Sequence, residues 1–145
     1  LPADRPRPAV RTSAGALHTF EVPAELTARL TAVAREGGAS LFMALTAVTQ
    51  LVLSRYTGRR DIALGTVVSG RERPELEDLV GFFVNTLVLR QRVEERVSFD
   101  AFLRQVRATV LEAFAHQEAP FDRVVEAVGA DRDPSRSPLV QALLV

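Results

Sequence analysis

Two short segments of this chain carry apolar side chains on both faces of an extended backbone, and they constrain the fold most. In residues Asp61–Val68 and in residues 82–90, apolar residues occupy odd and even positions alike. A strand of this kind is buried on both faces, so other layers of structure must cover it. The sequence therefore predicts two interior strands.

Four segments with helical spacing surround these strands, and Pro, Ser, Gly or His residues mark their ends. Their expected limits are Pro23 to Gly37, Ser40 to Gly58, Ser98 to His116 and Pro120 to Gly129. The second helix is apolar nearly all round, which predicts that it is buried. One apolar stripe is Leu41, Leu45, Val48, Val52 and Tyr56, and Phe42, Ala44 and Leu51 make its flanks apolar too. Strands that alternate with helices predict an α/β fold, an open sheet covered by helices.

The two ends of the chain carry weaker patterns. Residues 16–22 alternate apolar and polar side chains, as a half-buried strand does, and residues 139–145 are typical of an apolar strand. The proline-rich residues 1–15 predict a linker. We therefore expect residues 16–145 to form one folded lobe that is truncated at its C-terminal strand.

Composition excludes several classes of function. The 18 basic residues balance 18 acidic ones, which argues against nucleic acid or a membrane surface as a partner. No Lys or Cys occurs, so Schiff-base and thiolate chemistry and cysteine-bound metals are excluded, and a cytoplasmic location is expected. The apolar runs are too short to span a bilayer. Motifs of the GxSxG, HExxH, GxGxxG and Walker types do not occur in the sequence. It therefore gives no signal for a catalytic triad, a metal site or a phosphate loop.

A few polar residues are candidates for a site. Asn85 shares a strand face with Phe83 and Leu87, where its amide either finds hydrogen-bond partners in the core or faces a polar cavity. Both readings stay open. His116 ends a helix, which favours an interaction with the last carbonyls over a role as a general base. Arg71 and Arg73 either hold a phosphate or pair with neighbouring glutamates, and the second reading is favoured.

Residues 80–90 closely resemble the VGFFVNTLVLR-type motif of condensation domains in nonribosomal peptide synthetases. Residues 65–71, 116–122 and 132–139 resemble further segments of that family, in the same order and spacing. The resemblance covers the whole chain. The HHxxxDG motif, whose second His the family uses at the reaction centre, is absent, because the chain contains no His-His pair.

The resemblance implies a lobe like that of chloramphenicol acetyltransferase, with an open mixed sheet covered by helices. Two such lobes flank a tunnel in which a donor acyl or peptidyl thioester and an acceptor aminoacyl thioester form an amide, as in antibiotic and other secondary-metabolite biosynthesis. Carrier proteins deliver both substrates on phosphopantetheine arms, so no directly bound cofactor and no metal is expected. The implied partners are the N-terminal lobe, donor and acceptor carrier proteins and a neighbouring adenylation domain.

By the same resemblance, Asn85 and Thr86 lie in the substrate tunnel, and Ser69, Gly70 and Arg71 form its floor loop. This chain would form one wall of the tunnel. No catalytic residue is expected in it, because the catalytic His belongs to the missing N-terminal lobe, and the isolated fragment is predicted to be inactive. The alternative is a catalytically inactive condensation-like domain that acts as a binding module and recruits a partner protein.

Overall fold

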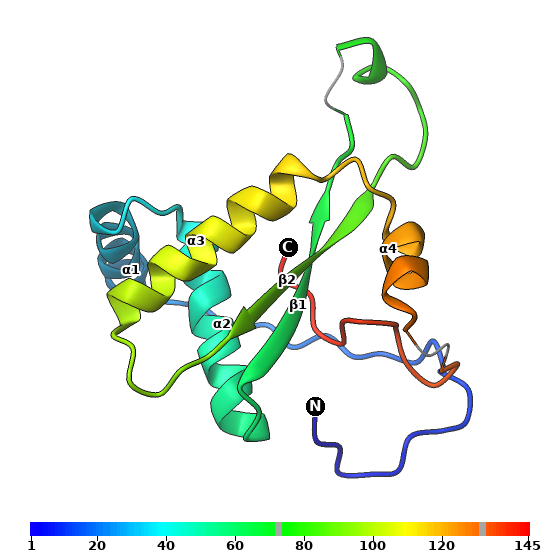
Figure 1. Cartoon of the computed structure of the whole chain (residues 1–145), viewed down its shortest axis with the longest axis horizontal. Helices are drawn as coiled ribbons and strands as arrows, with labels where there is room; N and C mark the ends of the chain where they lie inside the picture. The colour runs from blue at the N-terminus through cyan, green and yellow to red at the C-terminus, as the bar shows by residue number, and fades with distance from the viewer. Residues whose placement is uncertain (72–73, 131–132) are drawn as a thin grey trace.

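The computed structural model describes residues 1–71, 74–130 and 133–145 (Figure 1). Helices and strands alternate along it, as the sequence predicts. In chain order they are α1 (Ala24–Glu36), α2 (Leu41–Thr57), β1 (Asp61–Val68), a 3₁₀ turn η1 (Pro74–Leu76), β2 (Asn85–Arg92), α3 (Phe99–Ala115) and α4 (Phe121–Val128). Ser40 and Ser98 cap α2 and α3 through their side chains, and glycines in the left-handed conformation end α2 and α4.

The two strands form an antiparallel pair along their whole length. Asp61 lies opposite Arg92 at one end and Val68 lies opposite Asn85 at the other. The strand predicted for residues 82–90 therefore begins only at Asn85. The residues before Asn85 do not pair with β1, and Phe82 is 89% exposed.

A third segment meets the free edge of β1. The Gly65 N–H donates to the Ala142 carbonyl at 2.9 Å, and the Leu144 N–H donates to the Gly65 carbonyl at 2.9 Å. The bridge between Gly65 and Leu143 is parallel, so the sheet is mixed, as expected. The predicted strand at 139–145 is reduced to this single bridge within the described residues.

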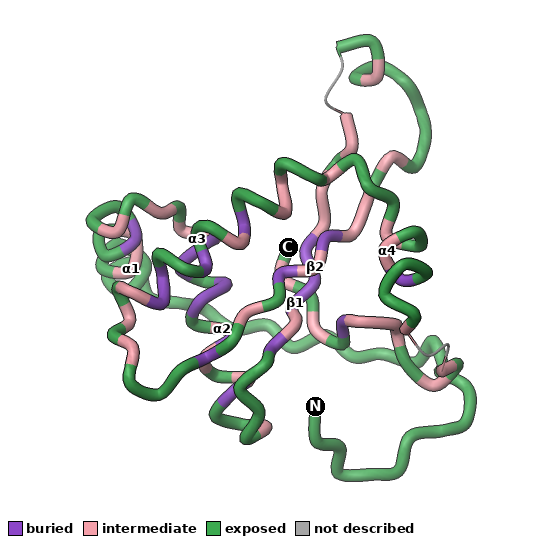
Figure 2. Tube along the Cα trace, in the orientation of Figure 1, coloured by how far each residue is buried: buried purple, intermediate pink, exposed green. Residues whose placement is uncertain are grey.

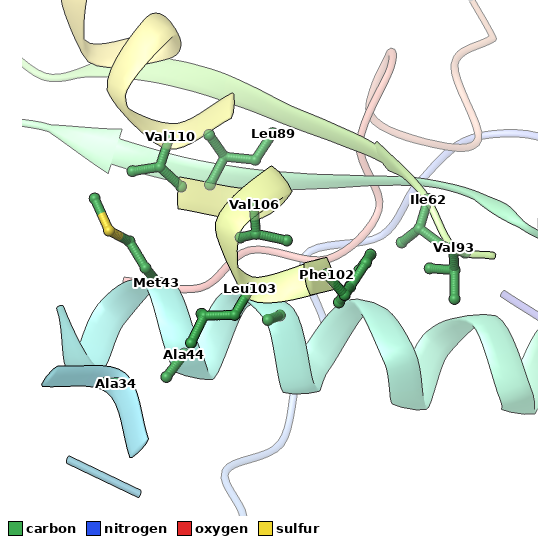
Figure 3. Close-up of a cluster of buried hydrophobic side chains, with 11 residues drawn as sticks. Ala34, Met43, Ala44, Ile62, Leu89, Val93, Phe102, Leu103, Val106 and Val110 are labelled. Atoms are coloured by element: carbon green, nitrogen blue, oxygen red, sulfur yellow. The ribbon is translucent and has the colours of Figure 1, made fainter. Parts of the chain in front are cut away.

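The core lies between α2, α3 and the hairpin, with α1 packed on α2 (Figures 1 and 3). Figure 2 shows the buried residues concentrated where these elements face one another. Fully buried side chains include Leu64, Leu89, Leu103, Val106 and Val110. The spacing along α3 predicts a buried face made of Phe99, Phe102, Leu103, Val106, Val110 and Phe114. The middle four are buried, which confirms this face, and Phe99 and Phe114 at its ends are half-buried. In Figure 1, α4 stands on the other side of the hairpin from α1, α2 and α3.

The prediction that α2 is buried nearly all round was wrong for one of its faces. Val52 is 58% exposed and Tyr56 is 73% exposed, while Ala44, Ala47 and Gln50 are fully buried. The helix is apolar on most of its surface, so its pattern alone does not select a face. Small residues at 44 and 47 allow neighbouring elements to approach closely, which favours that side for packing.

The strand predicted for residues 16–22 is also wrong. These residues form neither helix nor strand, and Leu17 and Phe20 are 91% and 76% exposed. A strand needs a neighbour to accept its backbone hydrogen bonds, and no described residue pairs with this segment. Among the described helices, none alone is long and apolar enough to cross a membrane; only α1 and α2 taken together are, and they are bent by 102° at their junction.

Candidate functional site

Asn85 is the first residue of β2, and its side chain is fully engaged with the backbone of another segment. Its amide Nδ2 donates to the carbonyls of Gln117 and Ala119, both at 2.8 Å. Its Oδ1 accepts from the Phe121 N–H at 3.1 Å. Both donors of the amide are therefore used, as the first of the two sequence readings expects. The second reading, a residue of a substrate tunnel, stays a prediction.

These bonds make Asn85 a cap for α4 that comes from a different element. The first N–H groups of a helix have no partner within it, and the N-cap residue Pro120 has no side-chain oxygen to offer. The Oδ1 of Asn85 accepts from the Phe121 N–H, the first of the helix, whereas a Ser or Asp at the N-cap would accept from the second or third. Asn85 thus ties the connection between α3 and α4 to the end of the hairpin.

The three residues predicted for the floor loop follow directly after β1. Ser69 is exposed and Gly70 is half-buried. Gly70 has a φ of +62°, and a Cβ placed on it would collide with the Phe83 carbonyl oxygen. Only glycine suits both conditions, since it tolerates a positive φ and has no side chain to clash.

Arg71 turns back over the loop that follows it. One terminal nitrogen of its guanidinium donates to the carbonyls of Leu76 and Glu77 and the other to those of Leu79 and Gly81. The guanidinium carbon also lies 4.4 Å from the centre of the Phe83 ring. The predicted pairing of Arg71 with Glu75 or Glu77 is not found among the described residues, because these carbonyls take its donors. Arg73 and Glu72 lie outside the described residues.

The loop, the start of β2 and the connection between α3 and α4 surround a cavity of about 380 Å³. Its lining residues are Gly70, Leu76, Phe83, Val84, Asn85, Gln117, Glu118 and Pro120. Three of the four segments that resemble the condensation family therefore meet at one end of the hairpin. Thr86 and Ser69 do not line the cavity, and strand alternation turns Thr86 to the opposite face from Asn85.

The chemistry available in this cavity is limited. Its lining offers apolar groups, two amides, backbone groups and one carboxyl, that of Glu118. His116 is exposed as the C-cap of α3, where its backbone N–H donates to the Ala113 carbonyl at 3.3 Å. Its imidazole has no hydrogen bond with the described residues. No group of three metal-ligating side chains occurs in residues 1–71, 74–130 and 133–145. Such a surface can shape and orient a substrate.

Sequence reasoning missed Gln117 and Glu118 as cavity residues. Both lie in the segment 116–122 whose resemblance was noted, so that resemblance was the available signal. The side chain of Asn85 bonds to the carbonyls of Gln117 and Ala119, more than thirty residues away, and no sequence pattern predicts these bonds.

The fourth segment of resemblance lies elsewhere. Asp133 holds a turn: its Oδ1 accepts from the Ser135 hydroxyl and N–H, and its Oδ2 pairs with Arg136 at 2.8 Å. The hydrogen bonds from Ser135 lower the pKa of the Asp133 carboxyl. Arg11 reaches the same region through Ser137, at 2.7 Å. This segment therefore anchors the N-terminal residues and takes no part in the cavity lining, while Arg132 lies outside the described residues.

A comparison with family models gives one match that covers residues 1–145, and its description is condensation domain. The chain belongs to the condensation-domain family. A linear gramicidin synthase of Brevibacillus parabrevis is 48% identical over 145 residues, which are 100% of this chain and 3% of that protein. Phosphinothricin tripeptide synthetase PhsC of Streptomyces viridochromogenes is also 48% identical, over 100% of this chain and 13% of its own length. The chain thus spans a small part of these relatives.

Solved structures agree with this assignment. A four-domain nonribosomal peptide synthetase, holo-AB3403 bound to AMP and glycine, superposes with a TM-score of 0.93 at 30% identity, over 97% of this chain and 11% of that one. The X-domain in a complex with OxyB from teicoplanin biosynthesis gives a TM-score of 0.93 at 27% identity, over 99% of this chain and 32% of that one. The predicted family, the mixed α/β fold and its similarity to condensation domains are confirmed.

Proposed function

We propose that this chain is part of a condensation domain that joins a donor acyl or peptidyl thioester to the amine of an acceptor aminoacyl thioester. In this reaction the amine nitrogen attacks the thioester carbonyl, a C–N bond forms, the C–S bond breaks, and the thiol leaves with the proton that the amine loses. The support is the family match over the whole chain and the similarity to peptide synthetases from different bacteria.

We further propose that the chain forms one wall and the floor loop of the substrate tunnel. The observation that carries this proposal is the convergence of three family-like segments around one cavity of about 380 Å³, although they are separate in sequence. A neutral amine that attacks a thioester needs orientation and a dry site more than strong acid-base assistance. A lining of apolar side chains, with an Asn85 amide whose donors are already bonded, suits that task.

The proposed partners follow from the same family. Donor and acceptor carrier proteins would deliver the substrates on phosphopantetheine arms, and an N-terminal lobe with HHxxxDG would supply the catalytic His. A neighbouring adenylation domain would load the acceptor amino acid. Because no His-His pair occurs in this chain, we propose that the chain alone does not catalyse condensation.

Dipeptide formation between loaded carrier proteins tests this function. The chain is assayed alone, and then mixed with the upstream lobe that carries HHxxxDG; the complete domain serves as the positive control. Product from the complete domain and the mixture, with none from the chain alone, is expected. Product from the chain alone would refute the proposed division of labour. No product from the complete domain would refute the enzymatic function itself.

The second candidate is a binding module without catalysis. The observation that favours it is the similarity to the X-domain, which was solved in a complex with OxyB. A degraded HHxxxDG motif in the upstream lobe, together with no condensation by the complete domain, would establish this alternative. An intact motif with turnover would exclude it.

A further inference from the structure

The side chain of Arg71 bonds to several backbone carbonyls, more than a residue that only paired with a neighbouring glutamate would reach. Its two terminal nitrogens reach four carbonyls, those of Leu76, Glu77, Leu79 and Gly81, of which the Leu79 contact is 2.8 Å. All four lie in residues 76–81, from the last residue of η1 toward the start of β2. Arg71 itself stands immediately after Gly70, at the other base of the loop.

Backbone donors of the described loop residues meet only one of the four accepting carbonyls, that of Leu76. Residues 74–76 form a single 3₁₀ turn, closed by the bond from the Glu77 N–H to the Pro74 carbonyl at 3.1 Å. The Leu76 carbonyl also accepts from the Leu79 N–H at 3.4 Å, whereas the carbonyls of Glu77, Leu79 and Gly81 accept from no other backbone N–H of the described residues. Arginine near the end of a helical turn satisfies such carbonyls and carries a favourable charge for them.

The ring of Phe83 completes the arrangement from the other side. The guanidinium lies over it at 4.4 Å, so the planar group is held between an aromatic face and the carbonyls. Phe83 also lines the cavity, and its carbonyl lies where a side chain at Gly70 would be. Phe83 therefore contacts the guanidinium of Arg71 and also forms part of the cavity wall.

The loop held in this way carries the most exposed apolar side chains near the cavity. Val80 is fully exposed and Leu79 is 50% exposed. Figure 1 shows the segment between β1 and β2 extending beyond the end of the hairpin, away from the helices. Packing of the core does not fix its shape, because none of its residues belongs to the buried cluster. Its shape depends on bonds within the loop, and Arg71 supplies four of them.

We propose that Arg71 is a positioning residue for the condensation reaction: its guanidinium sets the shape of residues 74–83 and so places Phe83 in the wall of the cavity. This inference rests on the proposed function for its effect on turnover. Its structural half, that Arg71 shapes the loop, stands independently of any activity. Arg71 does not touch the substrate in this account.

A forked cation is required for this role. The two terminal nitrogens of arginine bond to carbonyls on separate parts of the loop and the planar group stacks on Phe83, whereas a lysine ammonium is a single point. We therefore expect Arg71→Lys to behave like Arg71→Ala, although it retains the charge. A role that depended only on charge would leave Arg71→Lys close to the native protein.

The test compares Arg71→Lys and Arg71→Ala with the native residue in the complete condensation domain. Arg123→Ala is the control, because Arg123 is an exposed arginine whose side chain bonds only to Glu126 among the described residues. Hydrogen exchange at the amides of Glu77 and Leu79, which donate within the loop, reports the shape of the loop. Exchange is expected to be about tenfold faster or more in both Arg71 variants, since even one lost bond to a charged donor corresponds to that factor.

Turnover and binding separate positioning from general damage. In both Arg71 variants we expect kcat to fall by roughly tenfold, the size of effect typical of a displaced reacting geometry. The KM for the acceptor carrier protein and the melting temperature should stay close to native values, because the loop lies outside the core. Arg123→Ala should match the native domain in exchange and in kcat.

Native loop protection in Arg71→Lys would overturn the proposal, because a point charge would then suffice. Faster exchange with native kcat in both variants would overturn the positioning role. If the native domain itself makes no product, the proposed function fails, and the exchange measurement alone decides whether Arg71 shapes the loop.

Discussion

Asn85→Asp is the substitution that most directly tests how the candidate site is built. It is nearly isosteric, but it replaces the Nδ2 group, which donates to two carbonyls at 2.8 Å, with a carboxylate oxygen that cannot donate. Two hydrogen bonds are lost at about 1 kcal/mol each, and half-buried carbonyl oxygens then face a negative charge. We expect the free energy of unfolding of the complete domain to fall by about 2–4 kcal/mol at neutral pH.

The pH dependence of this variant identifies the cause. The facing carbonyls disfavour the charged carboxylate, so the pKa of Asp at position 85 should be raised in the folded state above the unfolded value of about 3.9. The folded state then binds the proton more strongly than the unfolded state does. The stability that this proton supplies is fully present below pH about 3.9 and is lost as pH rises through the folded pKa.

Urea unfolding of Asn85→Asp and Asn85→Ala at several pH values measures both effects. The alanine variant loses all three bonds but introduces no charge, so it is the control for the pH term. Hydrogen exchange at the Phe121 amide reports whether the first turn of α4 loses its cap. An aspartate variant with native stability at neutral pH, or one whose deficit relative to alanine does not shrink toward acid pH, would refute this account of Asn85.

Substitutions at three further positions have distinct expected results. Gln50 donates to the Leu89 carbonyl at 3.0 Å, while its own buried Oε1 has no described partner. By urea unfolding, Gln50→Met should therefore change the free energy of unfolding by less than about 1.5 kcal/mol. Gln50→Glu should lower it by more than about 2 kcal/mol at pH 7. Gly70→Ala should destabilise more than the matched control Gly129→Ala, because both have a positive φ and only Gly70 would also clash, with the Phe83 carbonyl. The hydrogen bonds from Arg90 lower the pKa of Asp61, so the pair stabilises above the usual Asp pKa of about 3.9 and the effect is lost as pH falls through the lower folded value. Since this pair is exposed, Asp61→Asn should cost less than about 1 kcal/mol at pH 7, and titrated thermal unfolding checks both points.

The parts of the fold that could be predicted are those whose signals are local. Ser40 and Ser98 cap helices, and Gly58 and Gly129 end them, because the bonds and conformations concerned involve only neighbouring residues. Strand β1 was predicted with its observed bounds, since a strand buried on both faces has no competing helical pattern. The buried face of α3 also followed from its spacing.

The errors have a common cause: they concern partners that a local pattern cannot specify. The apolar stripe on α2 through Val48 and Val52 is exposed because packing selected the side with Ala44 and Ala47. Residues 16–22 have the alternation of a strand but no described neighbour to pair with. Periodicity shows that a surface is apolar, and tertiary contacts decide whether it is covered.

In the candidate site, the sequence predicted the polar residues but not the groups that they contact. Family resemblance singled out Asn85 and Arg71 by type and place, but their partners are backbone carbonyls, which every residue has and which leave no trace in a sequence. Both side chains bond to backbone groups of another segment, Asn85 to the first N–H of α4 and Arg71 to carbonyls between Leu76 and Gly81. Their polar atoms are therefore largely occupied before any substrate arrives. Under the proposed function, a wall made in this way presents apolar side chains and an Asn85 amide whose donors are already bonded, so it would orient a neutral amine without competing for its lone pair.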